Sequence, residues 1–302
     1  KAEIESKPDW MQVGNALNDN AEYTVQNLSS AFGSDVDCSD DGTRVIVGAY
    51  TADVGGTNRG QAFVFNWNGS GWVQLGNTLQ GTQNLENLGY AVAISGDGNY
   101  IVVGSPFHDE GAGDVGKYSV FYLNGATWTI LPDSGVLTNL SDTFVGPSTS
   151  AVAGWSLSLS HDGKTIAAGY RRLASGAGGD AGQIRVHTYA NGAWTLKGQN
   201  LNGLESNDRF GENVKITPDG NYLIAGAKYG AKSEVYVYDY DSSSSQWVKR
   251  TTLSHPTLPN ANTHFYGGGI AISDDGNTVA VGANGDDTDG TDYGRVYVYT
   301  WS

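Results

Sequence analysis

The densest group of potential metal ligands in the sequence is a run of aspartates near residue 290. It consists of Asp286, Asp287, Asp289 and Asp292. Carboxylate oxygens are the ligands that Ca²⁺ prefers. The run therefore makes calcium a candidate ligand, with a solvated acidic loop as the alternative, and nothing else in the chain requires a cofactor. A second, weaker acidic cluster consists of His108, Asp109, Glu110 and Asp114.

Aromatic and basic residues that break the pattern of the chain are candidates for ligand contact. Aromatic rings combine a flat apolar face with a polar edge, and arginine binds carboxylate or sulfate groups. The candidate ligand-binding residues are Tyr50, Phe107, His108, Tyr170, Arg171, Arg172, Tyr229 and Tyr293. They favour a site for a glycan or a protein, and a solvated arginine pair is the alternative for the two arginines.

Acidic pairs that could hydrolyse a glycosidic bond are poorly represented. Such an enzyme needs two carboxyl groups flanking the bond. Asp35, Asp37 and Glu212 are expected near the centre of the fold, but they fall in only two of the repeats described below. His187 stands where other repeats have Phe or Tyr, which indicates a core residue rather than a base. We therefore predict that the protein is not an enzyme, with a glycosidase as an alternative.

These candidate residues are positioned by five copies of one glycine pattern. In the copy at Gly211, a second glycine follows after nine residues and a third after six more. The five anchoring glycines are Gly33, Gly89, Gly154, Gly211 and Gly267. The residue before the second glycine is always aspartate: Asp41, Asp97, Asp162, Asp219 and Asp275.

Each copy predicts a β-hairpin followed by two further strands. Apolar residues alternate between the first two glycines, as at Val214 and Ile216, which indicates a strand with one buried face. The Asp-Gly pair suits a tight turn. A third strand, with valine at its fifth position, follows in all five copies. In four copies a fourth strand that begins with tryptophan comes next, and the last copy ends on its third strand.

The whole chain, 1–302, is therefore predicted to form one all-β domain, a five-bladed β-propeller of four-stranded antiparallel blades. Residues 10–14 resemble the fourth strand and are expected to complete the last blade, so that the N-terminal strand closes the ring. The predicted blades span residues 32–76, 89–131, 154–198, 210–250 and 267–301 plus 10–14.

With the strands named a to d from the centre outwards, the long and dissimilar loops fall on one rim. The b–c loops are expected at 50–59, 106–115, 170–181, 228–232 and 284–293, and a long d–a loop at 132–153. Variable loops on a rigid scaffold are where binding usually occurs. This variable rim is therefore the predicted working face.

Composition narrows the class of partner. The net charge of −15 would repel nucleic acid and anionic membrane surfaces, and no apolar run is long enough to span a membrane. The lone cysteine, Cys38, is expected to be a small core residue. The chain begins at Lys1, which suits a processed protein. Glycosylation sequons begin at Asn27, Asn68 and Asn139.

The segment LGYAVAISGDGNYIVVGSPFHDEGAGDVGKYSVF, residues 88–121, resembles the FG-GAP-type repeat, and related segments cover nearly the whole chain. This resemblance implies a propeller that acts in adhesion or ligand recognition, secreted or at the cell surface. The calcium loops of integrin-like members need about nine residues, and the a–b turn at residues 39–42 is too short for one. We expect a non-enzymatic recognition or structural module that binds a protein or a glycan and has the capacity for self-assembly; a multivalent lectin is the alternative.

Overall fold

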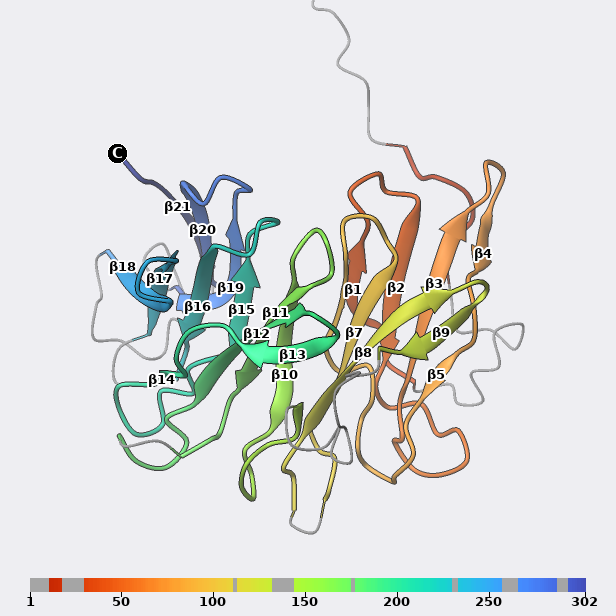
Figure 1. The fold of residues 1–302 in the computed structure, drawn as a ribbon, viewed down its shortest axis with the longest axis horizontal. Coiled ribbons are helices and arrows are strands. Elements are labelled where there is room, and N and C mark those ends of the chain that lie inside the picture. Colours follow the sequence, from red (N-terminus) through yellow and green to blue (C-terminus); the bar gives the residue numbers. More distant parts are fainter. Residues whose placement is uncertain are drawn as a thin grey trace, which may run out of the picture.

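The computed structural model contains twenty-one named strands, all paired in antiparallel sheets. It describes residues 11–17, 30–110, 113–131, 144–174, 177–229, 233–256, 266–286 and 293–302. The strands form five sheets, which confirms the predicted five-bladed β-propeller. The sheets follow one another along the chain, from blade one at the right of Figure 1 to blade five at the left.

Each blade runs from its inner strand outwards in chain order. Blade one contains β1 (Phe32–Cys38), β2 (Arg44–Ala49), β3 (Gln61–Trp67), β4 (Trp72–Gln74) and the short β5 (Leu79–Gln80). Blade two contains β6 (Val92–Ile94), β7 (Tyr100–Ser105), β8 (Lys117–Asn124) and β9 (Thr127–Ile130). Blade three contains β10 (Ala153–Leu159), β11 (Thr165–Tyr170), β12 (Gln183–Ala190), β13 (Ala193–Leu196) and β14 (Leu201–Asn202). Blade four contains β15 (Asn213–Ile216), β16 (Tyr222–Ala227), β17 (Glu234–Asp241) and β18 (Gln246–Ser254). Blade five contains β19 (Tyr266–Ile272), β20 (Thr278–Ala283) and β21 (Arg295–Thr300).

The repeated aspartates form the a–b turns, as predicted. The Asp219 carboxylate accepts the backbone N–H of Asn221 at 3.0 Å and the hydroxyl of Thr217 at 2.5 Å. The same bond to the backbone N–H two residues on recurs in the other four turns, at Asp41, Asp97, Asp162 and Asp275. The turns therefore use this carboxylate as a local hydrogen-bond acceptor.

Close backbone contact between glycines joins neighbouring blades. A methyl group added to Gly48 would lie 2.1 Å from the carbonyl oxygen of Gly89 in the next blade. The equivalent distances from Gly104, Gly169 and Gly226 to the next blade are 2.2, 2.1 and 2.8 Å. No side chain fits at this point, so the third glycine of each repeat is required by blade packing rather than by its own backbone angles.

Buried apolar residues on facing strands fill these four junctions. Between blades three and four, Ile184 and Val186 pack in one cluster with Val214 and Ile216. Each of these four side chains is buried. The alternating apolar residues of each inner strand therefore pack against the preceding blade, as Val214 and Ile216 do here.

The tryptophans of the outer strands also join neighbouring blades. The indole N–H of Trp128 donates to the carbonyl of Leu75 at 2.8 Å, and that of Trp247 donates to Lys197 at 2.7 Å. The indole of Trp72 donates in the same way to Val13, at 3.0 Å. Residues 13 and 14 thus occupy, beside blade one, the place that the end of an outer strand occupies beside the next blade.

The junction between blades five and one differs from the other four. Val36 is 58% exposed, and Val296 and Val298 are 71% and 64% exposed, although their equivalents elsewhere are buried. No heavy atom of the described residues lies within 4 Å of a methyl group placed on Gly33. Cys38 is exposed at the same junction, so the prediction that it is a core residue was wrong.

Blade five has three strands in the part of the chain that the structure describes. Residues 11–14 lie exposed without forming a strand, and Trp10 lies outside the described residues. In the other blades, the outer strand bonds the c strand: Leu75 N–H donates to Val64 at 2.7 Å, and Lys197 N–H donates to Val186 at 2.7 Å. By equivalence Val13 would donate to Val298, so the pairing of residues 10–14 with blade five stays a prediction.

Closure of this junction can be tested by cross-linking. Packed sheets lie about 10 Å apart, too far for a disulfide but within reach of a short bis-maleimide. We expect Val298→Cys to be cross-linked to Cys38 within one chain, because the equivalent pairs face each other at the other junctions. Peptide mass spectrometry of the monomer band would show the linked pair. Val248→Cys, at an exposed position on blade four, is the control, and cross-linked dimers without an internal link would contradict closure.

His187 provides a test of core packing. Burial lowers the pKa of His187 from 6.5 to about 4, and its Nδ1 lies 3.1 Å from the hydroxyl of Tyr118. The folded protein therefore holds a neutral ring, whose contribution to stability is complete above pH 6.5 and is lost as the pH falls towards 4. His187→Phe should remove roughly 3 kcal/mol of acid destabilisation between pH 7 and pH 4. Urea unfolding at both pH values measures it, and an unchanged difference would refute the assignment.

Candidate ligand-binding site

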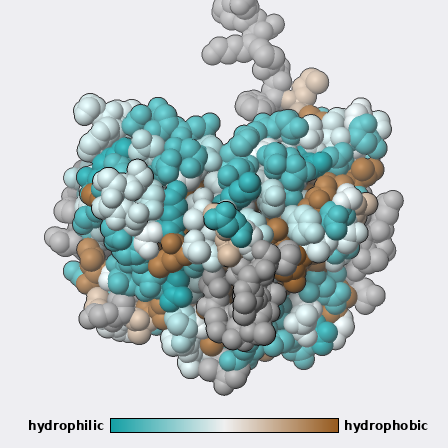
Figure 2. All heavy atoms as spheres, in the orientation of Figure 1, coloured by the Kyte–Doolittle hydropathy of each residue, from teal (hydrophilic) through white to brown (hydrophobic). Residues whose placement is uncertain are grey.

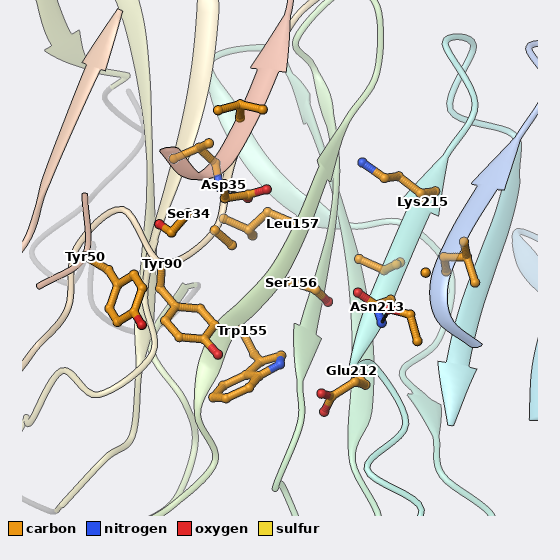
Figure 3. Close-up of a pocket in the computed structure, with 17 residues that line it drawn as sticks. Ser34, Asp35, Tyr50, Tyr90, Trp155, Ser156, Leu157, Glu212, Asn213 and Lys215 are labelled. Atoms are coloured by element: carbon orange, nitrogen blue, oxygen red, sulfur yellow. Dashed lines mark hydrogen bonds between the residues drawn. The ribbon is translucent and has the colours of Figure 1, made fainter. Parts of the chain in front are cut away.

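The inner strands of all five blades line one central cavity of about 560 Å³. One ring of positions, directly after the first glycine of each repeat, is occupied by Ser34, Tyr90, Trp155, Glu212 and Gly268. The next position contributes Asp35, Ala91, Ser156, Asn213 and Gly269. Figure 3 shows how the labelled members of both rings lie in the cavity.

Aromatic side chains form a continuous wall at one end of this cavity. The rings of Tyr50 and Tyr90 are 5.2 Å apart, and those of Tyr90 and Trp155 are 4.5 Å apart. Phe107 meets Tyr90 and Trp155 edge-on, at 6.2 and 6.1 Å. We call these four residues, which come from blades one, two and three, the aromatic wall. Tyr50, Tyr90 and Trp155 line the cavity (Figure 3), and Phe107 packs against two of them.

Local backbone geometry sets the direction of these side chains. The pairing register of β10 with β11 shifts between Ala153 and Leu157, so Trp155 leaves the regular alternation of its strand. Such irregularities re-aim side chains and are frequent beside functional sites. Tyr90 is half-buried, and burial raises its pKa to about 12. Its hydroxyl therefore stays protonated, able to donate a hydrogen bond.

An ion pair continues the wall towards blade four. The Arg171 guanidinium bonds to the Glu212 carboxylate, and their side chains are 13% and 10% exposed. The guanidinium also lies 3.9 Å from the centre of the Trp155 ring. Burial raises the pKa of Glu212, while the charge of Arg171 opposes that rise. The pair therefore presents a fixed, partly desolvated charge distribution next to an aromatic face.

The acids of blade one have structural partners in the next blade. The Asp35 carboxylate accepts the backbone N–H of Val92 at 2.7 Å, and Asp37 accepts that of Ile94 at 2.9 Å. Burial raises the pKa of both carboxyl groups, while these hydrogen bonds and Lys215 oppose the rise. Both acids thus connect blades one and two, and Asp35 does so at the cavity surface.

The structure brings four of the sequence-derived candidates together. Tyr50, Phe107 and Arg171 belong to the wall and its ion pair, and the ring of Tyr229 lies 5.4 Å from the Arg171 guanidinium. Tyr293 is 76% exposed and lines a neighbouring hollow that shares Gly268 and Gly269 with the central cavity.

The remaining ligand candidates lie elsewhere. Tyr170 is fully buried beneath the Arg185 guanidinium, so it leaves the candidate set. His108 is buried and lies 3.2 Å from the Glu86 carboxylate. Arg172 pairs with Asp180 at 3.3 Å. These three side chains are engaged within the scaffold.

The acidic run proposed for calcium is described only at its first member. Asp286 is buried and accepts the Tyr297 hydroxyl at 2.6 Å, with His255 Nε2 at 2.9 Å. Asp287, Asp289 and Asp292 lie outside the described residues. Among the described residues, no three His, Cys, Asp or Glu side chains gather as a metal site. Calcium binding stays a prediction.

Of the glycosylation sequons, only the one at Asn68 is described. Asn68 is exposed in a turn, where its side-chain oxygen accepts the backbone N–H of Gly71 at 2.9 Å. Asn27 and Asn139 lie outside the described residues. Glycosylation at all three stays a prediction.

Sequence reasoning missed the two central members of the wall, Tyr90 and Trp155. A signal was present, because the position after the first glycine differs in all five repeats while the glycine itself does not. A position that varies within a strict repeat is free of the packing constraint and available for function.

Comparison with known proteins supports the fold. Residues 27–65 match the FG-GAP repeat, which together with the five blades confirms the resemblance to FG-GAP-type propellers. No curated protein matches the chain in sequence. In the described residues, no helix is long and apolar enough to cross a membrane.

Several solved structures share the architecture. The periplasmic gluconolactonase of Pseudomonas aeruginosa superposes with a TM-score of 0.55 at 14% identity, over 89% of this chain and 68% of that one. A Bacteroides uniformis protein named as a 6-phosphogluconolactonase gives 0.55 at 15%, over 89% and 68%. A protein from Lactobacillus plantarum gives 0.52 at 14%, over 88% and 70%.

The prediction that the protein is not an enzyme was wrong, because it excluded an activity that the comparisons leave open. Proteins with lactonase names share the fold. Moreover Asp35 and Glu212, from blades that are not neighbours, line the same cavity. An identity near 15% carries the fold and not the activity, so the chain is a candidate enzyme without an assigned reaction.

The ion pair of the site is expected to contribute measurably to stability. Glu212→Ala would leave the Arg171 charge buried without its partner, which costs about 3 kcal/mol. Urea unfolding measures this loss, with the exposed Glu205→Ala as control. Adding Arg171→Ala should restore part of the stability, since both charges are then gone. Equal losses at Glu205 and Glu212 would contradict the pairing.

Proposed function

We propose that this propeller recognises a glycan outside the cell at the mouth of its central cavity. The observation that carries the proposal is the aromatic wall, in which Tyr50, Tyr90 and Trp155 line the cavity and Phe107 packs against Tyr90 and Trp155. Rings of this kind offer flat faces to the C–H surface of a sugar, at a low cost in side-chain entropy.

Burial separates these rings from those that only pack. Tyr118, Tyr266 and Phe63 are fully buried and belong to the blade cores. By contrast, Tyr50, Tyr90 and Trp155 are half-buried and line the cavity. A ring left partly in water on a concave surface is better explained by a ligand than by core packing.

Polar groups beside the wall supply the hydrogen bonds that a sugar needs. The hydroxyl of Tyr90 is a donor, and Ser34 adds a hydroxyl in the same cavity. The amide of Asn213 is engaged with the carbonyls of Gly267 and Gly268, at 3.1 and 3.0 Å. Part of the polar surface is thus held in place before a ligand arrives, which favours selective binding.

The site is single rather than repeated. Equivalent positions in blades one and five hold Ser34 and Gly268, so the wall cannot be repeated around the ring. This asymmetry favours one ligand site over the equivalent sites of a multivalent lectin. The face shown in Figure 2 is mostly hydrophilic, with hydrophobic residues in separate small patches.

A glycan array, with and without calcium, tests the proposal. We expect binding of a defined glycan class, and a loss of about tenfold or more in affinity for Trp155→Ala. Trp301→Ala is the matched control, because Trp301 is 56% exposed and lies on blade five outside the cavity lining. Silence across the array, or equal losses in both variants, would count against glycan recognition; a co-purifying protein would favour a protein ligand.

A glycosidase is the second candidate, because Asp35 and Glu212 line the same cavity and burial raises the pKa of both. Hydrolysis needs one protonated and one ionised carboxyl group. Bound oligosaccharides should therefore be incubated and assayed for new reducing ends. If the protein cleaves these oligosaccharides, and Glu212→Gln abolishes the cleavage while the oligosaccharides still bind, the protein is a glycosidase.

A further inference from the structure

Three cations gather around one ring at the edge of the proposed glycan site. Arg209, Lys228 and Arg171 lie 4.6, 5.3 and 5.4 Å from the centre of the Tyr229 ring. They come from three separate segments. Arg209 precedes β15, Lys228 lies in the b–c loop of blade four, and Arg171 lies in the b–c loop of blade three. We call Arg209, Lys228 and Tyr229 the basic edge.

This concentration of positive charge is unusual for the chain as a whole, which carries a net charge of −15. All three cations oppose the rise in the pKa of Glu212 that burial causes, so they act on the same carboxylate. That carboxylate bonds directly to Arg171. A group of cations this close together attracts anions.

Arg209 adds a second sign of an incomplete site. Its Nε is buried and makes no hydrogen bond among the described residues. A buried guanidinium nitrogen without an acceptor is costly, because guanidinium donors are well matched to carboxylate and sulfate oxygens. At the same position two residues before the anchoring glycine, other repeats have Ala31, Asn87 and Val152. The scaffold itself does not require a cation there.

The basic edge adjoins the aromatic wall through a single side chain. The Arg171 guanidinium lies over the Trp155 ring at 3.9 Å and also faces Tyr229. The acids Asp35 and Asp37 belong to blade one, and Lys215 opposes the rise in their pKa. The basic edge lies on blade four, beside the Trp155 face that would hold a sugar ring.

We propose that the glycan carries an oxyanion, a carboxylate or a sulfate, that binds at Arg209 and Lys228 while its ring stacks on the aromatic wall. The proposal rests on the proposed function and deepens it to acidic sugars. Carboxylate and sulfate share the chemistry that the guanidinium recognises, with two oxygens facing two donors. Binding of the anion would supply the acceptor that Arg209 Nε lacks.

Calorimetry with matched trisaccharides tests the inference: trigalacturonate, neutral galactotriose and a sulfated galactotriose. We expect at least one anionic trimer to bind about tenfold or more tighter than the neutral one, as charge-assisted hydrogen bonds allow. Arg209→Gln and Lys228→Gln should reduce this ratio towards one, without weakening the neutral trimer. The two anionic arms show whether carboxylate or sulfate is preferred.

Arg172→Gln is the matched control, since Arg172 neighbours Arg171 in sequence but pairs with Asp180. It should leave the ratio unchanged. Equal affinity for the neutral and anionic trimers, together with loss of both in Trp155→Ala, would overturn the anion site and leave glycan recognition intact. Binding of none of the trimers, combined with a silent glycan array, would overturn both.

Discussion

The contact on which the rest of the molecule depends is the backbone approach between glycines of neighbouring blades. At four junctions there is no room for a methyl group between the third glycine of one repeat and the first glycine of the next. This contact fixes how closely the inner strands can meet around the axis. Apolar residues such as Ile184 and Val214 then fill the wider space behind it. Near the axis, polar side chains reach the backbone of the neighbouring blade, as Asp35 reaches Val92 and Ser156 reaches Gly211.

The same constraint explains why the candidate site lies where it does. Gly89, Gly154 and Gly211 pack closely against the preceding blade, so the residue after each of them has a fixed position on the cavity side. That position is Tyr90 in blade two, Trp155 in blade three and Glu212 in blade four. A rigid framework with one freely varying position per blade places different side chains side by side at the cavity mouth. The aromatic wall and the ion pair of Arg171 with Glu212 are the outcome of this arrangement.

The sequence predicted the features that are local and repeated. The glycine spacing, the turn-forming aspartates and the alternation of apolar residues recur five times, so each copy supports the others, and the blades follow from them. Features that depend on how blades meet could not be predicted in this way. Tyr170 ends a b strand and looked like a loop residue, but its ring turns into the core beneath Arg185. Cys38 occupies a position that alternates with polar residues, as core residues do. It nevertheless lies at the junction of blades five and one, where the described residues of both blades are exposed. The grouping of Arg171 with Arg209, 38 positions along the chain, has no counterpart in any repeat.

Stability and recognition therefore rest on different residues of the same strands. The buried clusters and glycine contacts hold the blades together, and none of them needs the basic edge or the half-buried rings of the wall. One of those groups is placed at some cost, because a buried guanidinium nitrogen without a hydrogen bond is unfavourable. A scaffold whose stability comes from elsewhere can tolerate that cost. An anion bound beside Arg209 would remove it, so the feature that costs stability in the free protein is the feature that would favour binding.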